Sequence, residues 1–475
     1  MNHKANFLDR LDRHNYLVFL CLFAIAFVLR FHSFLPITLD RDEATYAVFA
    51  DHMLNGSELY KDIQDIKPPG IFLIYSGIQL VFGKSLIAIR LMSMLAVASA
   101  AFFLYLVKRT WGFELIPSLL TSVIYILCFN YFFGLSGNTE LYFIWCFALG
   151  LLVFAKATNS AGYFLSGLVI GVGLLIKQHI AFDFAALGLF FLISSIRSQT
   201  FWRNFVSMAL MVIGFLIPYV LVHLYFLWNG NWEYYEYVTY IAPNNYSGGH
   251  HLVTTLKFNL TAILMFSPFV VMMIMSFRQA HIPAFFKLLI VLLLCFDLVA
   301  VNLTGKPFKH YLLQLVIPIS LMAGEAYHVS VFRKLLDRKV FQKIAMGIVV
   351  VYALTLGVVY RHYRFDTARE LVHFFDGRIK PEESLYVADA PSILYWYFDK
   401  RSLTKFVHPT LTVFPHHIKE LKIDIQEELG GILRQEPSYI VISDRYPHTW
   451  FLKAVKEDYD QVADLERYTV YQVKN

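Results

Sequence analysis

Two acidic residues that follow the first long apolar stretch are the strongest candidates for chemistry in this chain. The sequence LDRDEATYAVFADHM (39–53) places Asp42 and Glu43 at the exit of that stretch. A carboxylate there can act as a general base on a hydroxyl group or as a ligand for a hard metal ion. Acidic residues are also favoured in the first turn of a helix by the helix dipole, so the pair alone leaves both interpretations open.

A lysine held by two prolines is the second candidate. In IKPPGIFLIYSGIQLVFG (66–83), Lys67 precedes two prolines that force the chain to extend or turn, and an apolar segment follows. A lysine fixed at a membrane surface is a point charge suited to a phosphate group. A lysine that only anchors the chain by extending its charge toward water has the same pattern.

A third cluster, GKPFKHYLLQLVIP (305–318), combines basic and aromatic residues within a few positions. Ammonium and imidazole groups at such a site can neutralise an anionic leaving group as it departs. Other polar turns add candidate substrate contacts, although Asn138 and Glu140 also fit a helix cap, and adjacent histidines at 250 and 251 are a weak metal signal. The candidates of the basic and aromatic cluster are Lys306, Lys309, His310 and Tyr311. The candidate substrate contacts are Tyr46, Asn138, Glu140, Lys177, Gln178, Asn244 and His250.

The composition indicates that membrane helices must position these residues. The chain has 475 residues, of which 57% are hydrophobic and 16% charged, whereas soluble domains carry about 25% charged residues. The net charge of +6 resides in short clusters between apolar stretches, which excludes a nucleic-acid signal. The four cysteines lie within apolar stretches without paired spacing, so we expect no disulfide framework. Stretches long enough to span a bilayer predict about eleven spans, at 16–35, 85–107, 115–133, 140–156, 162–176, 180–196, 205–228, 258–277, 284–303, 311–327 and 341–360.

The basic residues between the spans predict the orientation. Lysines and arginines cluster on one side if the spans alternate, and the positive-inside rule makes that side, with the amino terminus, cytoplasmic. The candidate residues then all face the opposite side. Lys177 and the lysines of 305–318 break the positive-inside rule there, and an anionic ligand is the simplest explanation.

The sequence divides at about residue 360. We expect a transmembrane domain at 1–360 and an extracytoplasmic α/β domain at 361–475, because the second part has ordinary charge density. Alternating residues predict strands at 383–389 and 437–444, and helical spacing predicts helices at 418–434 and 449–465. The spacing of Tyr46, Phe49 and Met53 predicts a helix in the membrane interface, and 66–83 predicts a second interfacial segment.

These motifs, in this order and on one side, resemble the bacterial relatives of protein O-mannosyltransferases and lipid A aminoarabinose transferases. The resemblance covers roughly 40–318 and implies the GT-C fold of polyprenyl-phosphate-sugar-dependent glycosyltransferases. It implies that Asp42 is catalytic, that Lys67 contacts the donor phosphate, and that Lys309 and His310 lie near it. The aminoarabinose branch has an acidic residue that takes part in a metal site where this chain has Ile66, so no cofactor is expected with certainty and a divalent metal ion is left open.

The implied reaction is transfer of a sugar, with inversion, from an undecaprenyl (polyprenyl) phosphate donor to a hydroxyl of a periplasmic or cell-surface acceptor: lipid A, O-antigen, another glycan or a protein. Asp42 would be the base, assisted by Glu43, in an enzyme of the bacterial inner membrane. Two alternatives remain at this stage. A transporter or flippase of lipid-linked glycans would place its polar residues near the bilayer midplane, and a scaffold would use the outer domain as a binding module.

Overall fold

The computed structural model describes residues 7–131, 134–245, 252–336 and 367–474, with five single positions between the last two ranges. The chain forms two compact units, each built from separate stretches of sequence. Unit 1 comprises Met1–His32, Arg90–Val222 and Gly248–Val358. Unit 2 comprises Ser33–Ile89, His223–Ser247 and Val359–Asn475. The predicted domain boundary near residue 360 falls outside the described residues and stays a prediction.

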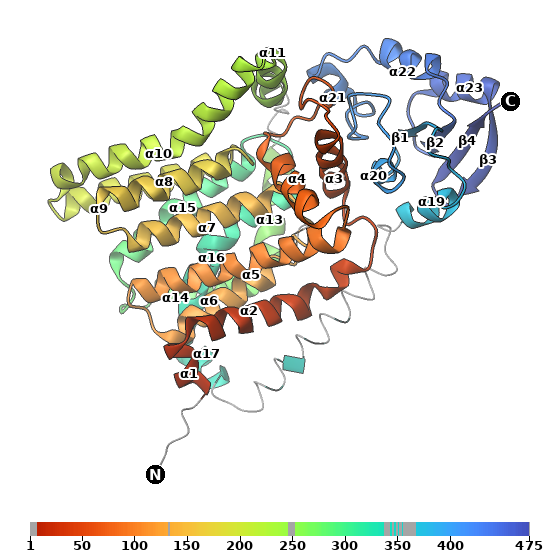
Figure 1. Ribbon diagram of the computed structural model, residues 1–475. Helices are drawn as coiled ribbons and strands as arrows, with labels where there is room; N and C mark the ends of the chain where they lie inside the picture. Colours follow the sequence, from red (N-terminus) through yellow and green to blue (C-terminus); the bar gives the residue numbers. More distant parts are fainter. Residues whose placement is uncertain are drawn as a thin grey trace. The chain divides into compact units, whose positions relative to one another are not determined.

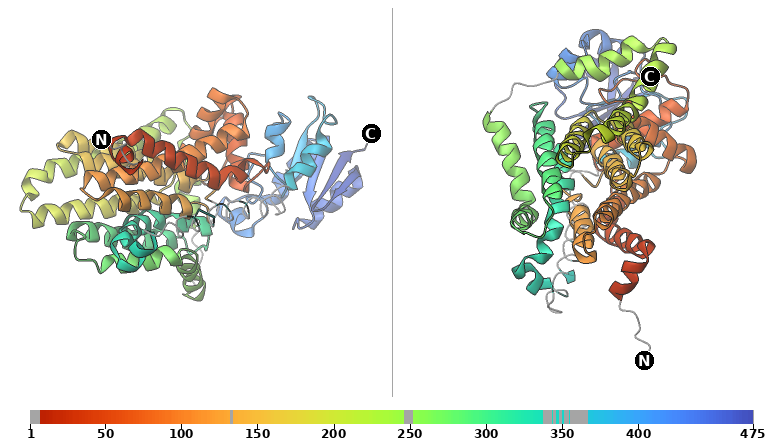
Figure 2. Two further views of the ribbon diagram at one scale, coloured as in Figure 1. Left: turned by 90° about the horizontal axis from the view of Figure 1, so that it is seen from below. Right: turned by 90° about the vertical axis from the view of Figure 1, so that its left-hand side faces the viewer.

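Unit 1 is a bundle of apolar helices that run roughly alongside one another (Figures 1 and 2). Helix α7 packs on α8, α9 packs on α15, and α16 packs on both α6 and α14. Two of its long helices, α5 and α10, have one end in unit 2. The helices of this unit are α1 (Phe7–Arg13), α2 (Asn15–Arg30), α5 (Leu86–Thr110), α6 (Leu115–Cys128), α7 (Thr139–Lys156), α8 (Ser160–Leu174), α9 (Ile180–Arg197), α10 (Phe201–Trp228), α13 (Leu252–Met265), α14 (Ser267–Phe277), α15 (Ala284–Asn302), η3 (Lys309–Leu315), α16 (Val316–Ala323), η4 (Gly324–His328) and α17 (Ser330–Leu336).

Several helices are shorter than the predicted spans, whereas α5, α7, α9 and α10 are at least as long as predicted. Among the described residues, six are long and apolar enough to cross a membrane, or seven if α13 and α14, which meet at 82°, count as one bent span. The segments 115–133 and 162–176 form helices of 14 and 15 residues, and 311–327 alternates between 3-10 and α-helix. The predicted spans 115–133 and 311–327 thus include residues outside regular α-helix, and 341–360 lies largely outside the described residues.

Two glycines allow α8 and α10 to touch through their backbones. A Cβ at Gly167 would lie 1.9 Å from the carbonyl oxygen of Met211, and one at Gly171 would lie 2.2 Å from that of Phe215. No side chain fits at these distances, so only glycine permits this approach. The close packing orders unit 1 near the candidate residues of α7 and the turn after α8.

Unit 2 begins with a helix whose acidic start is capped by its own sequence. The Asp40 carboxylate accepts a hydrogen bond from the backbone N–H of Glu43 at 2.8 Å, as an N-cap residue does for the third helical position. Helix α3 (Arg41–Leu54) is buried along most of its length, with Tyr46 and Phe49 fully covered. It packs on α4 (Gly70–Phe82), so the predicted interfacial helix is a core element of this unit.

A four-stranded sheet forms the carboxyl-terminal part of unit 2. Its strand order is β1-β2-β4-β3, with β1 (Leu385–Ala388) parallel to β2 (Tyr439–Ser443), and β4 (Tyr468–Val473) antiparallel to both β2 and β3 (Tyr459–Leu465). The predicted strands at 383–389 and 437–444 are β1 and β2. The helices of this unit that have not yet been named are α11 (Trp232–Glu236), η2 (Tyr237–Ile241), α12 (Ala242–Asn245), α19 (Thr367–Phe375), α20 (Ile393–Tyr397), α21 (Pro415–Glu420), α22 (Ile425–Arg434) and α23 (Thr449–Asp458) (Figure 1).

Two helix predictions in this part need correction. The predicted helix at 449–465 ends at Asp458, and Tyr459–Leu465 is strand β3, because its residues pair with β4 through the turn at 466–467. The predicted helix at 418–434 is two helices, since Lys422 adopts a positive φ of 51° and Asp424 caps α22. Helical spacing over a short window did not distinguish these cases from continuous helices.

Unit 2 joins three distant segments through its backbone and aromatic side chains. The backbone N–H of Gln64 donates to the carbonyl of Lys405 at 2.7 Å. The ring of Tyr60 packs against that of Tyr235, and the Asn231 amide donates to Glu58 at 2.7 Å. The segment between α3 and α4 is therefore held between the carboxyl-terminal part of unit 2 and the segment after α10.

Candidate functional site

Asp42 lies at the centre of a cluster of polar side chains in unit 2. Its Oδ2 atom is 3.7 Å from the Lys67 ammonium and accepts a hydrogen bond from the Tyr46 hydroxyl at 3.3 Å. Its Oδ1 atom is 3.0 Å from Nε2 of His408. The side chain remains 24% exposed. Asp42 is thus oriented from both sides and still accessible to a ligand.

The hydrogen bonds of His408 fix its role. The backbone N–H of Thr410 donates to Nδ1 at 3.2 Å, so Nδ1 carries the lone pair of a neutral imidazole and Nε2 carries the proton. Nε2–H then donates to Asp42. Since both nitrogens of His408 are engaged, this histidine orients the carboxylate, and Asp42 is the group left to accept a proton.

The other residues of the Asp40-to-Glu43 tetrad have separate structural roles. Asp40 caps α3, and the Arg41 guanidinium pairs with Asp389 after β1 at 2.7 Å. Glu43 is only 2% exposed, so its carboxylate is enclosed by protein. The sequence prediction that Glu43 assists Asp42 remains untested, but the two side chains differ sharply in access.

The prolines and a buried tyrosine position Lys67. The Tyr60 hydroxyl donates to the Lys67 carbonyl at 2.8 Å, and Tyr60 itself has a positive φ of 71°. Pro69 then occupies the N-cap position of α4. About a fifth of the Lys67 side chain is exposed, so an anion can approach its ammonium group.

An acidic residue two positions before Lys67 also belongs to this cluster. Asp65 is buried, and this burial raises its pKa, while the positive charge of Lys67 opposes the shift. The resemblance of the motifs directed attention to Ile66, and Asp65 was not among the predicted residues. The groups around Asp42 do not fit a metal site, because Lys67 is a cation and His408 presents an N–H instead of a lone pair.

A second acid, lysine and histidine cluster lies in unit 1. Glu140, at the start of α7, forms an ion pair with Lys177 through Oε1, and the same oxygen is 3.8 Å from Nε2 of His310. The Lys177 ammonium lies 3.9 Å from the centre of the Tyr311 ring, a cation–π contact. Glu140 and Lys177 are both buried. The structure thus brings together four predicted residues from three separate segments.

The remaining predicted residues have simpler surroundings. Lys306 lines a small, open surface hollow with Thr254, Thr255, Phe258 and Asn302. Lys309 is exposed at the start of η3, Gln178 lies in the turn before α9, and Asn138 is the buried N-cap residue of α7. Asn244 lies in α12, and His250 falls outside the described residues. The predicted part of Lys306, Lys309, His310 and Tyr311 in donor binding stays a prediction.

Sequence reasoning missed His408 and Asp65. His408 follows a segment without regular spacing, 366 residues after Asp42 in the chain, so no local pattern could indicate the contact. Asp65 stands beside the recognised proline motif, and its acidity next to a lysine was a usable signal.

Comparison with known proteins identifies the class of this fold. The crystal structure of ArnT from Cupriavidus metallidurans bound to undecaprenyl phosphate superposes with a TM-score of 0.66 at 14% identity, covering 96% of this chain and 97% of that one. The apo structure of the same protein gives a TM-score of 0.64 at 14% identity, with the same coverage. The chain therefore has the fold of ArnT, and six or seven spans among its described residues are long and apolar enough to cross a membrane.

Part of the sequence also matches a known protein family. Residues 66–226, about a third of the chain, match the sequence model of the dolichyl-phosphate-mannose-protein mannosyltransferase family. A search among curated proteins gives no significant match. The resemblance inferred from the motifs is confirmed by the family match and by the fold.

Proposed function

We propose that this protein transfers a sugar from a polyprenyl-phosphate donor to the hydroxyl group of an acceptor, with Asp42 as the base. The observation that carries the proposal is the contact of Asp42 with Lys67 and His408. These three side chains come from separate parts of the chain, and they place a proton acceptor next to a fixed positive charge.

The proposed step is a single displacement. The acceptor hydroxyl oxygen attacks the anomeric carbon of the sugar from the face opposite the phosphate. The bond from that carbon to the phosphate oxygen breaks, its electron pair stays on the phosphate, and the hydroxyl proton passes to Oδ2 of Asp42. His408 holds Oδ1 and so directs Oδ2 toward the acceptor.

Lys67 is proposed to bind the phosphate that leaves. Negative charge grows on the bridging oxygen as the bond breaks, and a fixed ammonium group stabilises the transition state more than the ground state. In the free protein Lys67 lies beside Asp42. Donor binding would draw its charge toward the phosphate and free Asp42 to accept the proton. A phosphate monoester is a stable anion, so a strong general acid is unnecessary.

The comparisons support the donor class. The ArnT structure, which shares the fold, binds undecaprenyl phosphate, and the matched family is named for dolichyl-phosphate-mannose. We therefore propose a sugar on undecaprenyl phosphate as the donor. We further propose a location in the bacterial inner membrane, with unit 2 on the periplasmic side and lipid A, O-antigen, another glycan or a protein as the acceptor.

The test is an assay of sugar transfer from polyprenyl-phosphate donors in membranes that hold equal amounts of each variant. Asp42→Asn should lower kcat by about 10²- to 10⁴-fold, the usual contribution of general base catalysis. Lys67→Ala should weaken the use of the donor by about 10- to 100-fold, the cost of losing one charged hydrogen-bond donor.

Matched controls come from the same loop. Lys61→Ala and Asp62→Asn alter exposed residues of the same two types and should retain nearly full activity. Near-normal transfer by both Asp42→Asn and Lys67→Ala would refute the proposed mechanism.

A further inference from the structure

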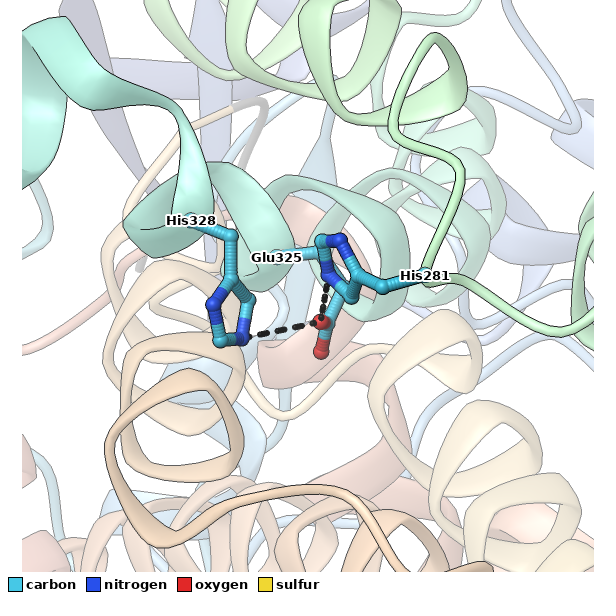
Figure 3. A group of neighbouring side chains, drawn as sticks. All are labelled: His281, Glu325 and His328. Atoms are coloured by element: carbon cyan, nitrogen blue, oxygen red, sulfur yellow. Dashed lines mark ion pairs between the residues drawn. The ribbon is translucent and has the colours of Figure 1, made fainter.

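Two histidines and a glutamate converge in unit 1, away from every residue that the sequence motifs indicated. Figure 3 shows both imidazole rings directed at the carboxylate of Glu325. His281 lies in the turn between α14 and α15, whereas Glu325 and His328 belong to η4. Residues close in space thus come from two segments more than forty positions apart.

The ligand atoms of this group point at one small volume. Oε2 of Glu325 is 3.7 Å from Nε2 of His281 and 3.8 Å from Nε2 of His328. The three candidate ligand atoms lie within 4.8 Å of one another, the one such group of three among the described residues. Ligands about 2.1 Å from a common tetrahedral zinc ion lie roughly 3.4 Å apart. The two glutamate–histidine separations need to contract by only a few tenths of an ångström, and small rotations of the partly exposed imidazole rings can bring the two ring nitrogens closer.

The carboxylate is oriented by a buried lysine. Glu325 is almost fully buried, and its other oxygen, Oε1, pairs with the ammonium group of Lys108. That ammonium also donates to the Thr121 hydroxyl at 3.2 Å. Lys108 therefore fixes the carboxylate from behind and leaves Oε2 toward the histidines, as outer partners of metal ligands do.

Close backbone packing holds η4 in this place. A Cβ at Gly324 would lie 2.2 Å from Thr121 Oγ1 and 2.6 Å from the Pro117 carbonyl oxygen. Only glycine permits η4 to lie this close to α6. The neighbouring Glu325 is thereby brought to Lys108, and its position does not depend on a flexible segment.

We propose that His281, Glu325 and His328 bind a divalent transition-metal ion, with Zn²⁺ the best match. Two imidazoles and one carboxylate are a ligand set that zinc uses with a water in the fourth position. His281 is 44% exposed and His328 is partly exposed, so an ion can reach the site from solvent. The ion would tie the turn before α15 to η4.

The site has no part in the proposed transfer step. On the orientation predicted from the basic residues, the turn between α14 and α15 and the end of η4 both face the cytoplasm. The segments that carry Asp42 and Lys67 face the opposite side. The proposed ion is thus a structural link that cytoplasmic metal can reach, and its binding is independent of donor and acceptor.

The experiment is a titration of the purified full chain in detergent with Zn²⁺ alone, using an affinity tag without histidines. Isothermal titration should give one equivalent of bound Zn²⁺ in the wild-type protein. His281→Ala and His328→Ala should each weaken this binding by at least about tenfold. His373→Ala, which changes an exposed histidine of α19, should leave it unchanged. Co²⁺ in place of Zn²⁺ should give visible absorption bands that both ligand variants lose.

Each outcome of the titration either supports the zinc site or overturns it. Binding that the two ligand variants abolish, with unchanged thermal unfolding temperature before metal is added, supports the site. An absence of stoichiometric Zn²⁺ binding overturns the proposal, and so does binding that survives both substitutions. Glu325→Gln is not needed, which avoids a variant that leaves Lys108 buried without its partner.

Discussion

Two clusters in this protein have the same chemical types, a carboxylate, a lysine and a histidine, but different surroundings. In unit 2, Asp42 and Lys67 are partly exposed, His408 is buried behind them, and the shortest contact is the hydrogen bond from the histidine to Asp42. In unit 1, Glu140 and Lys177 are buried against each other, with His310 nearby. Burial makes the second pair a structural element, because neither charge can leave its partner without a large cost. Because Asp42 and Lys67 are accessible, each of them can exchange its partner when a ligand binds.

The largest effect is expected from breaking the buried pair. Lys177→Met leaves the Glu140 carboxylate buried without its cation, which should destabilise the protein by about 3–5 kcal/mol. Lys67→Met should cost less than about 1 kcal/mol, because exposed pairs contribute little. Thermal and denaturant-induced unfolding in detergent measure both.

A double variant sharpens this comparison. Lys177→Met combined with Glu140→Gln removes both charges, and it should recover most of the lost stability, since no uncompensated charge remains. If Lys177→Met unfolds no more easily than Lys67→Met, the two clusters do not differ in the way described.

A smaller effect is expected from the histidine that orients Asp42. His408→Ala removes the hydrogen bond to Oδ1 and should lower kcat about tenfold while leaving the KM for the donor nearly unchanged, because the proposed donor contact belongs to Lys67. His408→Gln offers an amide N–H to Asp42 and should recover part of the activity. Equal losses of stability and activity in both variants would instead indicate a structural role.

The smallest effect concerns the pH dependence of the packing within unit 2. Burial lowers the pKa of His52 below its ordinary value of 6.5. Its Nδ1 faces the Val48 carbonyl and its Nε2 accepts the Ser402 backbone N–H at 3.0 Å, so the neutral ring is the one that fits. Its contribution to stability is complete above pH 6.5 and is lost as the pH falls toward the lowered pKa.

The measurement compares thermal unfolding of the wild type and His52→Gln at pH 7.5 and pH 5. The wild type should lose more stability on acidification than the variant, because the variant has no ring to protonate. An equal loss in both proteins would assign the acid sensitivity to other groups.

The sequence alone indicated the fold class, the apolar helices, two of the strands and the Asp42 and Lys67 motifs, because each follows from local spacing and charge. It overstated the lengths of some helices, such as α6, and took strand β3 for helix, since the pairing of β3 with β4 is not visible in a short window. It predicted that Glu43 assists Asp42, and the structure adds that Glu43 is buried whereas Asp42 is partly exposed.

What only the tertiary structure decided is which charged groups meet. His408 reaches Asp42, Lys177 reaches Glu140, and His281 reaches Glu325 across separations that no periodicity encodes. The types and order of the residues are written in the sequence, but the access of water to each carboxylate depends on how segments remote in the chain pack around it. That access determines whether a pair of opposite charges supports the fold or performs chemistry.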